Sequence, residues 1–119
     1  MSTKLVYSDH TQWRNVEGQY HREDGPAIEW TNGSKFWYLH GELHHENGPA
    51  IEWSDGTKEW YQNGKLHRVD GPASEWSDGS TSWWFNGEQY SETEHALLTW
   101  ERLTQEQQDD IIFGKSDVD

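Results

Sequence analysis

Basic side chains recur in this sequence at a spacing of 23 residues, and their chemistry is that of an anion-binding site. The row consists of His21, Arg22, His44, His45, His67 and Arg68. A guanidinium group can hold a carboxylate or a phosphate through two parallel hydrogen bonds, so the row predicts an anion-binding rim. The alternative interpretation is structural: Arg68 pairs with a nearby carboxylate, while Asp70 hydrogen-bonds its own turn at Gly71.

Acidic side chains recur at the same spacing and predict a second kind of surface. The set consists of Glu29, Glu52, Glu75, Asp55 and Asp78. An ordered acidic row could contact a basic protein through charge-assisted hydrogen bonds. The structural alternative is that each Glu pairs across a hairpin with Lys35 or Lys58, a weak interaction at an exposed site. That pairing cannot explain all three Glu residues, because Thr81 replaces the Lys in the last interval.

Neither a metal centre nor a catalytic centre is indicated. His21, His44 and His67 are too far apart to share one ion, because Zn–N distances are about 2 Å. The His40, His44 and His45 spacing suits one face of a helix, but this stretch is predicted to be a turn between strands. The chain has no cysteine, and no serine lies in a nucleophile-elbow pattern. We therefore expect no catalytic residues, no metal and no cofactor.

The charge balance restricts the class of partner. With 9 basic and 22 acidic residues, the formal net charge is −13, which disfavours contacts with nucleic-acid phosphates or an anionic membrane. No apolar run is long enough to span a bilayer, and residues 1–8 lack the apolar core of a signal peptide. The expectation is a cytoplasmic protein with a basic protein partner.

Glycine spacing indicates the elements that position these rows. Ten glycines fall in register at intervals of 23 residues, namely Gly18, Gly25, Gly33, Gly41, Gly48, Gly56, Gly64, Gly71, Gly79 and Gly87. Each interval holds two short β-prone runs, and Asn63-Gly64 is a strong hairpin-turn signal because both positions need φ > 0. The pattern predicts a mainly β chain. A half repeat and three full hairpins over residues 1–90 form an elongated single-layer antiparallel β-meander.

The tryptophans form two columns on these strands. Trp30, Trp53 and Trp76 alternate with the Glu column, so they should lie on the opposite face of the sheet, and we expect them to form the core. A second column consists of Trp37, Trp60 and Trp83, and each of these has an aromatic neighbour. A single layer cannot bury both columns, so one of them should be partly exposed or covered by the C-terminal segment.

Residues 91–113 leave the period and have helical signals. Ser91 and Glu94 form a capping-box pattern, and Ala96, Leu97, Trp100 and Leu103 follow at helical spacing. Thr104 and Gln107 form a second capping pattern, Ile111 to Phe113 would anchor the second helix, and Gly114 is a candidate stop. One or two short helices are expected to cap the last hairpin, or alternatively to form a dimer contact. Residues 114–119 are expected to be an acidic tail.

The residues also resemble a known family. The 23-residue length, the D-G-[ST]-x-x-W-[YW] segment and the N-G-K-x-H segment are similar to MORN repeats. The likeness is closest to a divergent variant of viral, phage and bacterial proteins with an H-R-x-D-G-P-A segment, here residues 21–27 and 67–73. It covers about two thirds of the chain and implies an elongated sheet used for binding or scaffolding, without catalytic residues. Classical MORN units differ near Arg22 and Trp37, so their lipid roles are not carried over.

Two functions remain open at this point. The first is a non-enzymatic interaction protein whose acidic repeat surface binds a basic protein. The resemblance extends this hypothesis to a viral nucleic-acid mimic that inhibits a host defence factor in the host cytoplasm. The alternative is a sponge that sequesters a nucleotide signal, with the phosphate on the Arg/His row and the base on an aromatic ring. A homodimer through the C-terminal helices or the exposed aromatic face is a further expectation.

Overall fold

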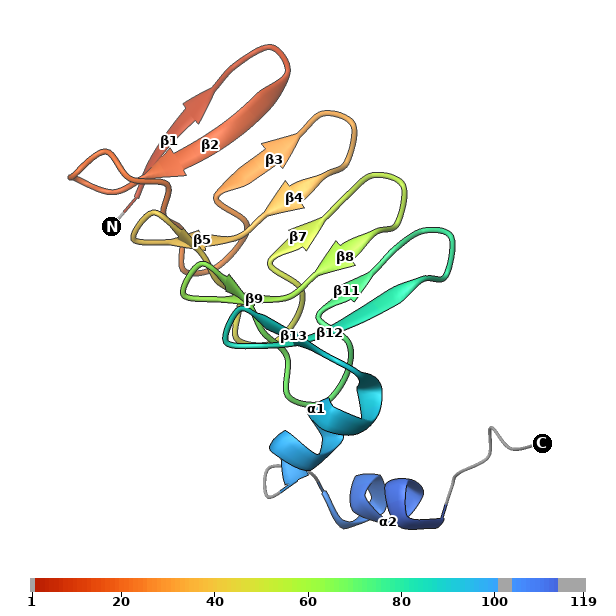
Figure 1. Ribbon diagram of the computed structural model, residues 1–119. Helices are drawn as coiled ribbons and strands as arrows, with labels where there is room; N and C mark the ends of the chain where they lie inside the picture. The colour runs from red at the N-terminus through yellow and green to blue at the C-terminus, as the bar shows by residue number, and fades with distance from the viewer. Residues whose placement is uncertain (1, 101–103, 114–119) are drawn as a thin grey trace.

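Figure 1 shows a computed structural model of the chain, which is mainly β with two short helices at its C-terminal end. The structure describes residues 2–100 and 104–113, with side chains described for residues 2–100 and 104–109. Within these residues the strands are β1 (Thr3–Val6), β2 (His10–Arg14), β3 (Ile28–Trp30), β4 (Lys35–Phe36), β5 (Tyr38–Leu39), β6 (Glu42–Leu43), β7 (Ile51–Glu52), β8 (Lys58–Glu59), β9 (Tyr61–Gln62), β10 (Lys65–Leu66), β11 (Ser74–Glu75), β12 (Thr81–Phe85) and β13 (Glu88–Tyr90). The helices are α1 (Glu92–Leu98) and α2 (Gln105–Phe113).

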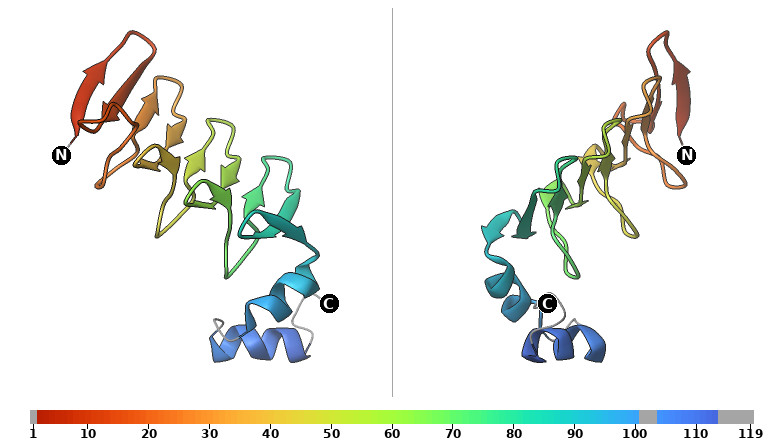
Figure 2. Two further views of the ribbon diagram at one scale, coloured as in Figure 1. Left: turned by 60° about the vertical axis from the view of Figure 1, so that its left-hand side comes forward. Right: turned by 90° about the vertical axis from the view of Figure 1, so that its right-hand side faces the viewer.

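Hairpins lie side by side in one long antiparallel sheet. Its strand order is β1-β2-β3-β4-β7-β8-β11-β12-β13, while β5-β6 and β9-β10 form two small separate hairpins. The molecule measures 51 × 28 × 22 Å, and the helices stand at the C-terminal end of the row rather than across the sheet (Figures 1 and 2). The elongated, single-layer antiparallel arrangement is therefore as predicted.

Turn chemistry explains why the strands are so short. Asn63 and Gly64 have φ values of 51° and 82°, so both central positions of this turn are left-handed, as the dipeptide predicted. Gly56 closes the neighbouring turn with φ 96°. Residues 57–62 between these two turns hold both β8 and β9, so each strand has only a few residues.

The cross-strand register divides the side chains between two faces. Ile28 lies opposite Phe36 and Glu29 lies opposite Lys35, which confirms the predicted alternation. We call the face with Trp30, Trp53 and Trp76 the open face. The other is the connector face, because three loops fold over it (Figure 2). The first, middle and third connectors are residues 21–26, 44–49 and 67–72.

The prediction that the Trp30 column forms the core is wrong for two of its members. Trp53 and Trp76 are 41% and 44% exposed, whereas Ala27, Ala50 and Ala73 have no exposed surface. The reason is that a single sheet has no second layer to receive a large side chain. The indoles instead lie outermost, and small residues such as Thr57 and Ser74 are buried on the same face.

The C-terminal helices begin where the capping patterns placed them. Ser91 and Glu94 form a complete capping box at α1. Thr104 and Gln107 exchange the equivalent pair of hydrogen bonds before α2. Of the apolar residues expected at helical spacing, Ala96 and Trp100 are half-buried, whereas Leu97 is 66% exposed. The buried residues at this helix are His95 and the C-cap residue Thr99.

Several C-terminal predictions lie outside the described residues. They concern Leu103, Gly114, the tail 114–119 and the side chains of 111–113. In the part of the chain that the structure describes, no helix is long and apolar enough to cross a membrane.

Candidate functional site

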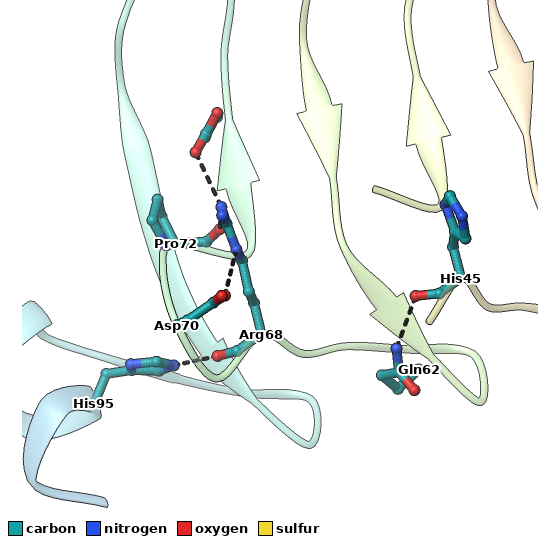
Figure 3. Close-up of polar contacts among 7 residues, drawn as sticks. His45, Gln62, Arg68, Asp70, Pro72 and His95 are labelled. Atoms are coloured by element: carbon teal, nitrogen blue, oxygen red, sulfur yellow. Dashed lines mark hydrogen bonds and ion pairs between the residues drawn. The ribbon is translucent and has the colours of Figure 1, made fainter. Parts of the chain in front are cut away.

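The first and third connectors each place an arginine on an indole ring. The guanidinium carbons of Arg22 and Arg68 lie 3.8 Å from the ring centroids of Trp13 and Trp60. Arg68 also donates to the carbonyl of Pro72 at 3.1 Å and to Asp70 at 3.1 Å (Figure 3). The guanidinium groups are thus held flat against the connector face by several contacts at once.

The same arginines reach the predicted acidic row. Arg22 Nη1 is 3.3 Å from Glu29 Oε2, and Arg68 Nη1 is 3.0 Å from Glu75 Oε2. These carboxylates keep 42% and 40% side-chain exposure. The structure therefore brings the two predicted surfaces together as ion pairs, in which each row partly neutralises the other.

Space, rather than backbone conformation, explains the glycine at the end of each of these connectors. A Cβ atom on Gly71 would lie 2.7 Å from Arg68 Cζ, and one on Gly25 would lie 2.7 Å from Arg22 Cζ. A side chain there would displace the guanidinium from its indole. This gives a physical reason for glycine directly before Pro26 and Pro72.

The middle connector differs because His45 stands where the others have arginine. Its imidazole stacks on Trp37 with ring centroids 3.7 Å apart, and its Nδ1 lies 2.9 Å from the carbonyl oxygen of Pro49. The side chain of Gln62 donates to the His45 carbonyl at 2.8 Å (Figure 3). Histidine thus reproduces the stack but is too short to reach Glu52, which lies between Lys35 and Lys58 in the register.

The histidine that begins each connector bonds to the backbone of the next turn and does not line an open anion-binding rim. The Nδ1 atoms of His21, His44 and His67 accept hydrogen bonds at 2.9–3.0 Å from the backbone N–H groups of His40, Asn63 and Asn86. His21 and His44 are buried. Because Nδ1 acts as an acceptor, the proton of the neutral ring is on Nε2. In His44 this nitrogen is 2.8 Å from Glu46.

Asp55 and Asp78 lie at the exposed tips of neighbouring hairpins. Their carboxylates accept hydrogen bonds from the backbone N–H groups of Thr57 at 2.8 Å and Ser80 at 2.9 Å. These backbone hydrogen bonds are the main reason that the pKa of each carboxyl is below its ordinary value. Both groups therefore carry a full negative charge close to exposed Trp53 and Trp76, which begin the same turns.

Sequence reasoning missed Glu59, an acidic residue on the open face. Its Oε2 accepts from Trp53 Nε1 at 2.8 Å and its Oε1 accepts from the Tyr61 hydroxyl at 2.9 Å. Burial, followed by this hydrogen bond, raises the pKa of Tyr61 to about 12. A signal was present in the sequence, because the positions 23 residues before and after Glu59 hold Phe36 and Ser82.

A cavity of about 300 Å³ lies between the first and middle connectors. Its walls include Arg22, Trp37 and His45, but also Asp24 and Glu46. The volume is at the lower end for small-molecule sites. Among the described residues, no group of three or more His, Cys, Asp or Glu side chains is placed to hold a metal ion.

Comparison of the chain with protein-family models, with curated proteins and with solved structures finds no match in any of the three. The connector network, the acidic turn tips and Glu59 are therefore the observations from which a function is inferred.

Proposed function

We propose that this chain is a non-enzymatic, MORN-like repeat protein that binds a basic protein partner. Two kinds of contact that recur from one unit to the next support the repeat. One is the histidine that holds the next turn, and the other is the ring or guanidinium on the connector-face indole. A chain that repeats a structural unit offers one surface several times, which suits binding rather than catalysis.

The observation that carries the proposal is the edge formed by the hairpin tips. Trp53 and Trp76 are 41% and 44% exposed, and Asp55 and Asp78 follow them two residues later. Exposed aromatic rings mark interaction surfaces, and carboxylates of lowered pKa keep their charge. Glu52 has no arginine in its connector, but it lies between Lys35 and Lys58 in the register, so the tip carboxylates Asp55 and Asp78 carry the proposal. In the mimic form of the proposal, this edge occupies a site for a nucleic-acid backbone.

The test is affinity capture from a cell lysate at rising salt concentration, followed by calorimetry with the purified partner. The wild-type chain is expected to retain a basic protein that is released by salt. The variant Asp55→Asn/Asp78→Asn should weaken binding about tenfold or more, because charge-assisted contacts contribute roughly 1.5–3 kcal/mol each. Glu17→Gln/Glu42→Gln is the matched control, since it also removes two exposed carboxylates, one in the turn at residues 15–18 and one in β6. Equal binding by both variants would contradict the proposal.

The cavity between the first two connectors supports a second candidate, a nucleotide sponge. Arg22 would contact the phosphate and Trp37 the base. The acidic walls and the Glu29 pair compete with a phosphate, which makes this the weaker proposal. A nucleotide-dependent rise in melting temperature that Arg22→Gln abolishes and Arg68→Gln retains is the expected result for this candidate.

A further inference from the structure

On the open face, an arrangement of two tryptophans with one residue between them occurs twice, and we call each arrangement a frame. The residue in the middle differs between the two frames. In the first frame Phe36 lies between Trp30 and Trp53, with ring centroids 6.3 and 5.1 Å away. In the second frame the register places Glu59 in the corresponding position, beside Ile51 and Ser74, so that Trp53 and Trp76 flank it diagonally. A carboxylate therefore stands where the neighbouring frame has a phenyl ring.

This carboxylate is fixed in position before any ligand arrives. Trp53 Nε1 donates to one oxygen at 2.8 Å and the Tyr61 hydroxyl donates to the other at 2.9 Å. A carboxylate can accept about four hydrogen bonds, so each oxygen retains acceptor capacity. Thr57, two residues before Glu59, is buried, and its Oγ1 accepts from the Ser77 backbone N–H at 3.1 Å. The frame is thus prearranged and its two indoles are open to solvent.

We propose that Glu59, Trp53 and Trp76 form a binding site for a cationic side chain, arginine or lysine, of a protein partner. This inference rests on the proposed function and names the anchor within it. Two features favour a cation over a neutral ligand such as a saccharide. Indole faces attract a cation through the ring quadrupole, and Glu59 adds a full charge of the complementary sign. The formal net charge of −13 acts in the same direction at long range.

The first frame serves as an internal control for this site. The substitution Glu59→Phe recreates the Phe36 arrangement between Trp53 and Trp76, so it should fold, because the chain already tolerates that packing one frame away. It removes the charge and fills the space together. Glu59→Gln removes the charge alone while retaining an acceptor for Trp53 Nε1 and Tyr61.

The experiment is an NMR titration of the indole N–H signals of the full chain with N-acetyl-arginine amide. The matched neutral probe is N-acetyl-citrulline amide, which has nearly the same shape without the charge. We expect saturable shifts of the Trp53 and Trp76 signals with the arginine probe only. Binding should be at least about tenfold weaker in Glu59→Gln, as for loss of a charge-assisted contact, and absent in Glu59→Phe. Glu42→Gln, which removes an exposed carboxylate in β6 and outside this frame, should leave the affinity within about twofold.

Three results would overturn the inference. These are equal shifts with the citrulline probe, undiminished binding by Glu59→Phe with a native spectrum, or shifts with cellobiose and none with the arginine probe. Failure of the proposed function is separable from this outcome. A chain that binds the arginine probe at Trp53 and Trp76 but captures no salt-sensitive basic partner refutes only the proposed function. A partner captured equally by the wild type and by Glu59→Phe refutes only this site.

Discussion

The two faces of the sheet carry tryptophans at the same spacing and use them differently. On the connector face Arg22, His45 and Arg68 each stack on an indole from their own chain. On the open face Trp53 and Trp76 remain more than two-fifths exposed. The comparison teaches that, in this single-layer sheet, the exposure of an indole depends on what covers its ring: a connector side chain covers Trp13, Trp37 and Trp60, whereas Trp53 and Trp76 keep a large exposed surface. The position within the strand decides only the face.

At the C-terminal end, a residue of helix α1 covers a connector-face indole. The imidazole of His95 packs against Trp83 with ring centroids 5.1 Å apart, and its Nε2 lies 2.5 Å from the carbonyl oxygen of Arg68 (Figure 3). Trp83 is the last connector-face indole, and no fourth connector follows it. A helix residue therefore takes the place that Arg or His has in the earlier connectors, which explains why α1 buries a histidine rather than its leucines.

The difference between the two faces is tested most strongly by removing one indole from each face and comparing the losses of stability. Trp60→Ala should lower the free energy of unfolding by on the order of 3 kcal/mol, because the ring is covered by Arg68 and its loss leaves a hole under the third connector. Trp53→Ala should cost about half as much, since two-fifths of that residue is already in water. Urea denaturation of the two variants measures the difference. Equal losses would mean that the faces are energetically alike.

His95→Ala tests whether α1 completes the connector face. The variant loses the contact with Trp83 and leaves the Arg68 carbonyl without its donor, so a loss of about 2 kcal/mol is expected in thermal or urea denaturation. Leu97→Ala on the same helix is the control and should change stability by less than about 0.5 kcal/mol, because Leu97 is 66% exposed. If Leu97→Ala is the more damaging variant, α1 is not a cap of this kind.

Two variants, Arg68→Gln and His45→Arg, test how much arginine contributes to stability relative to histidine in a connector. The first removes a stacked guanidinium and its two partly exposed ion pairs, with Asp70 and Glu75, which together should cost about 1–2 kcal/mol. The second introduces into the middle connector the arginine that the other two have, and it brings Glu52 within reach of a partner. It should raise stability by about 0.5 kcal/mol. The opposing signs in one denaturation series are the expected result, and a destabilised His45→Arg would show that the middle connector is built for histidine.

Local signals account for what the sequence could predict. The Asn63-Gly64 turn, the alternation of Ile28 and Glu29 and the Ser91 capping box each depend on residues within a few positions of one another. The stack of Arg68 on Trp60 depends on how a connector crosses the sheet. The alternation of side chains along a strand does not specify this path. For the same reason the Trp30 column was wrongly expected to form the core, and Glu29, expected to contact a partner or alternatively a lysine, also meets Arg22. Glu59 does not recur at the 23-residue spacing, since Phe36 and Ser82 hold the equivalent positions, so a pattern of recurring residues does not point to it.

The smallest expected effect is a shift in the titration of Tyr61, which reports whether Glu59 is fixed on the open face. Burial of the phenol is the largest cause of its raised pKa, followed by the hydrogen bond and charge of Glu59, and together they bring it to about 12. The folded state therefore holds this proton more tightly than the unfolded state, in which the pKa is about 10. The resulting stabilisation is complete below pH 10 and is lost as the pH rises from about 10 to about 12. An ultraviolet difference titration between the wild type and Tyr61→Phe isolates this group from the other four tyrosines. In Glu59→Gln the inflection should move down but stay above 10, because burial remains. An inflection near 10 in the wild type, or one that Glu59→Gln leaves in place, would show that the carboxylate is not held beside Tyr61.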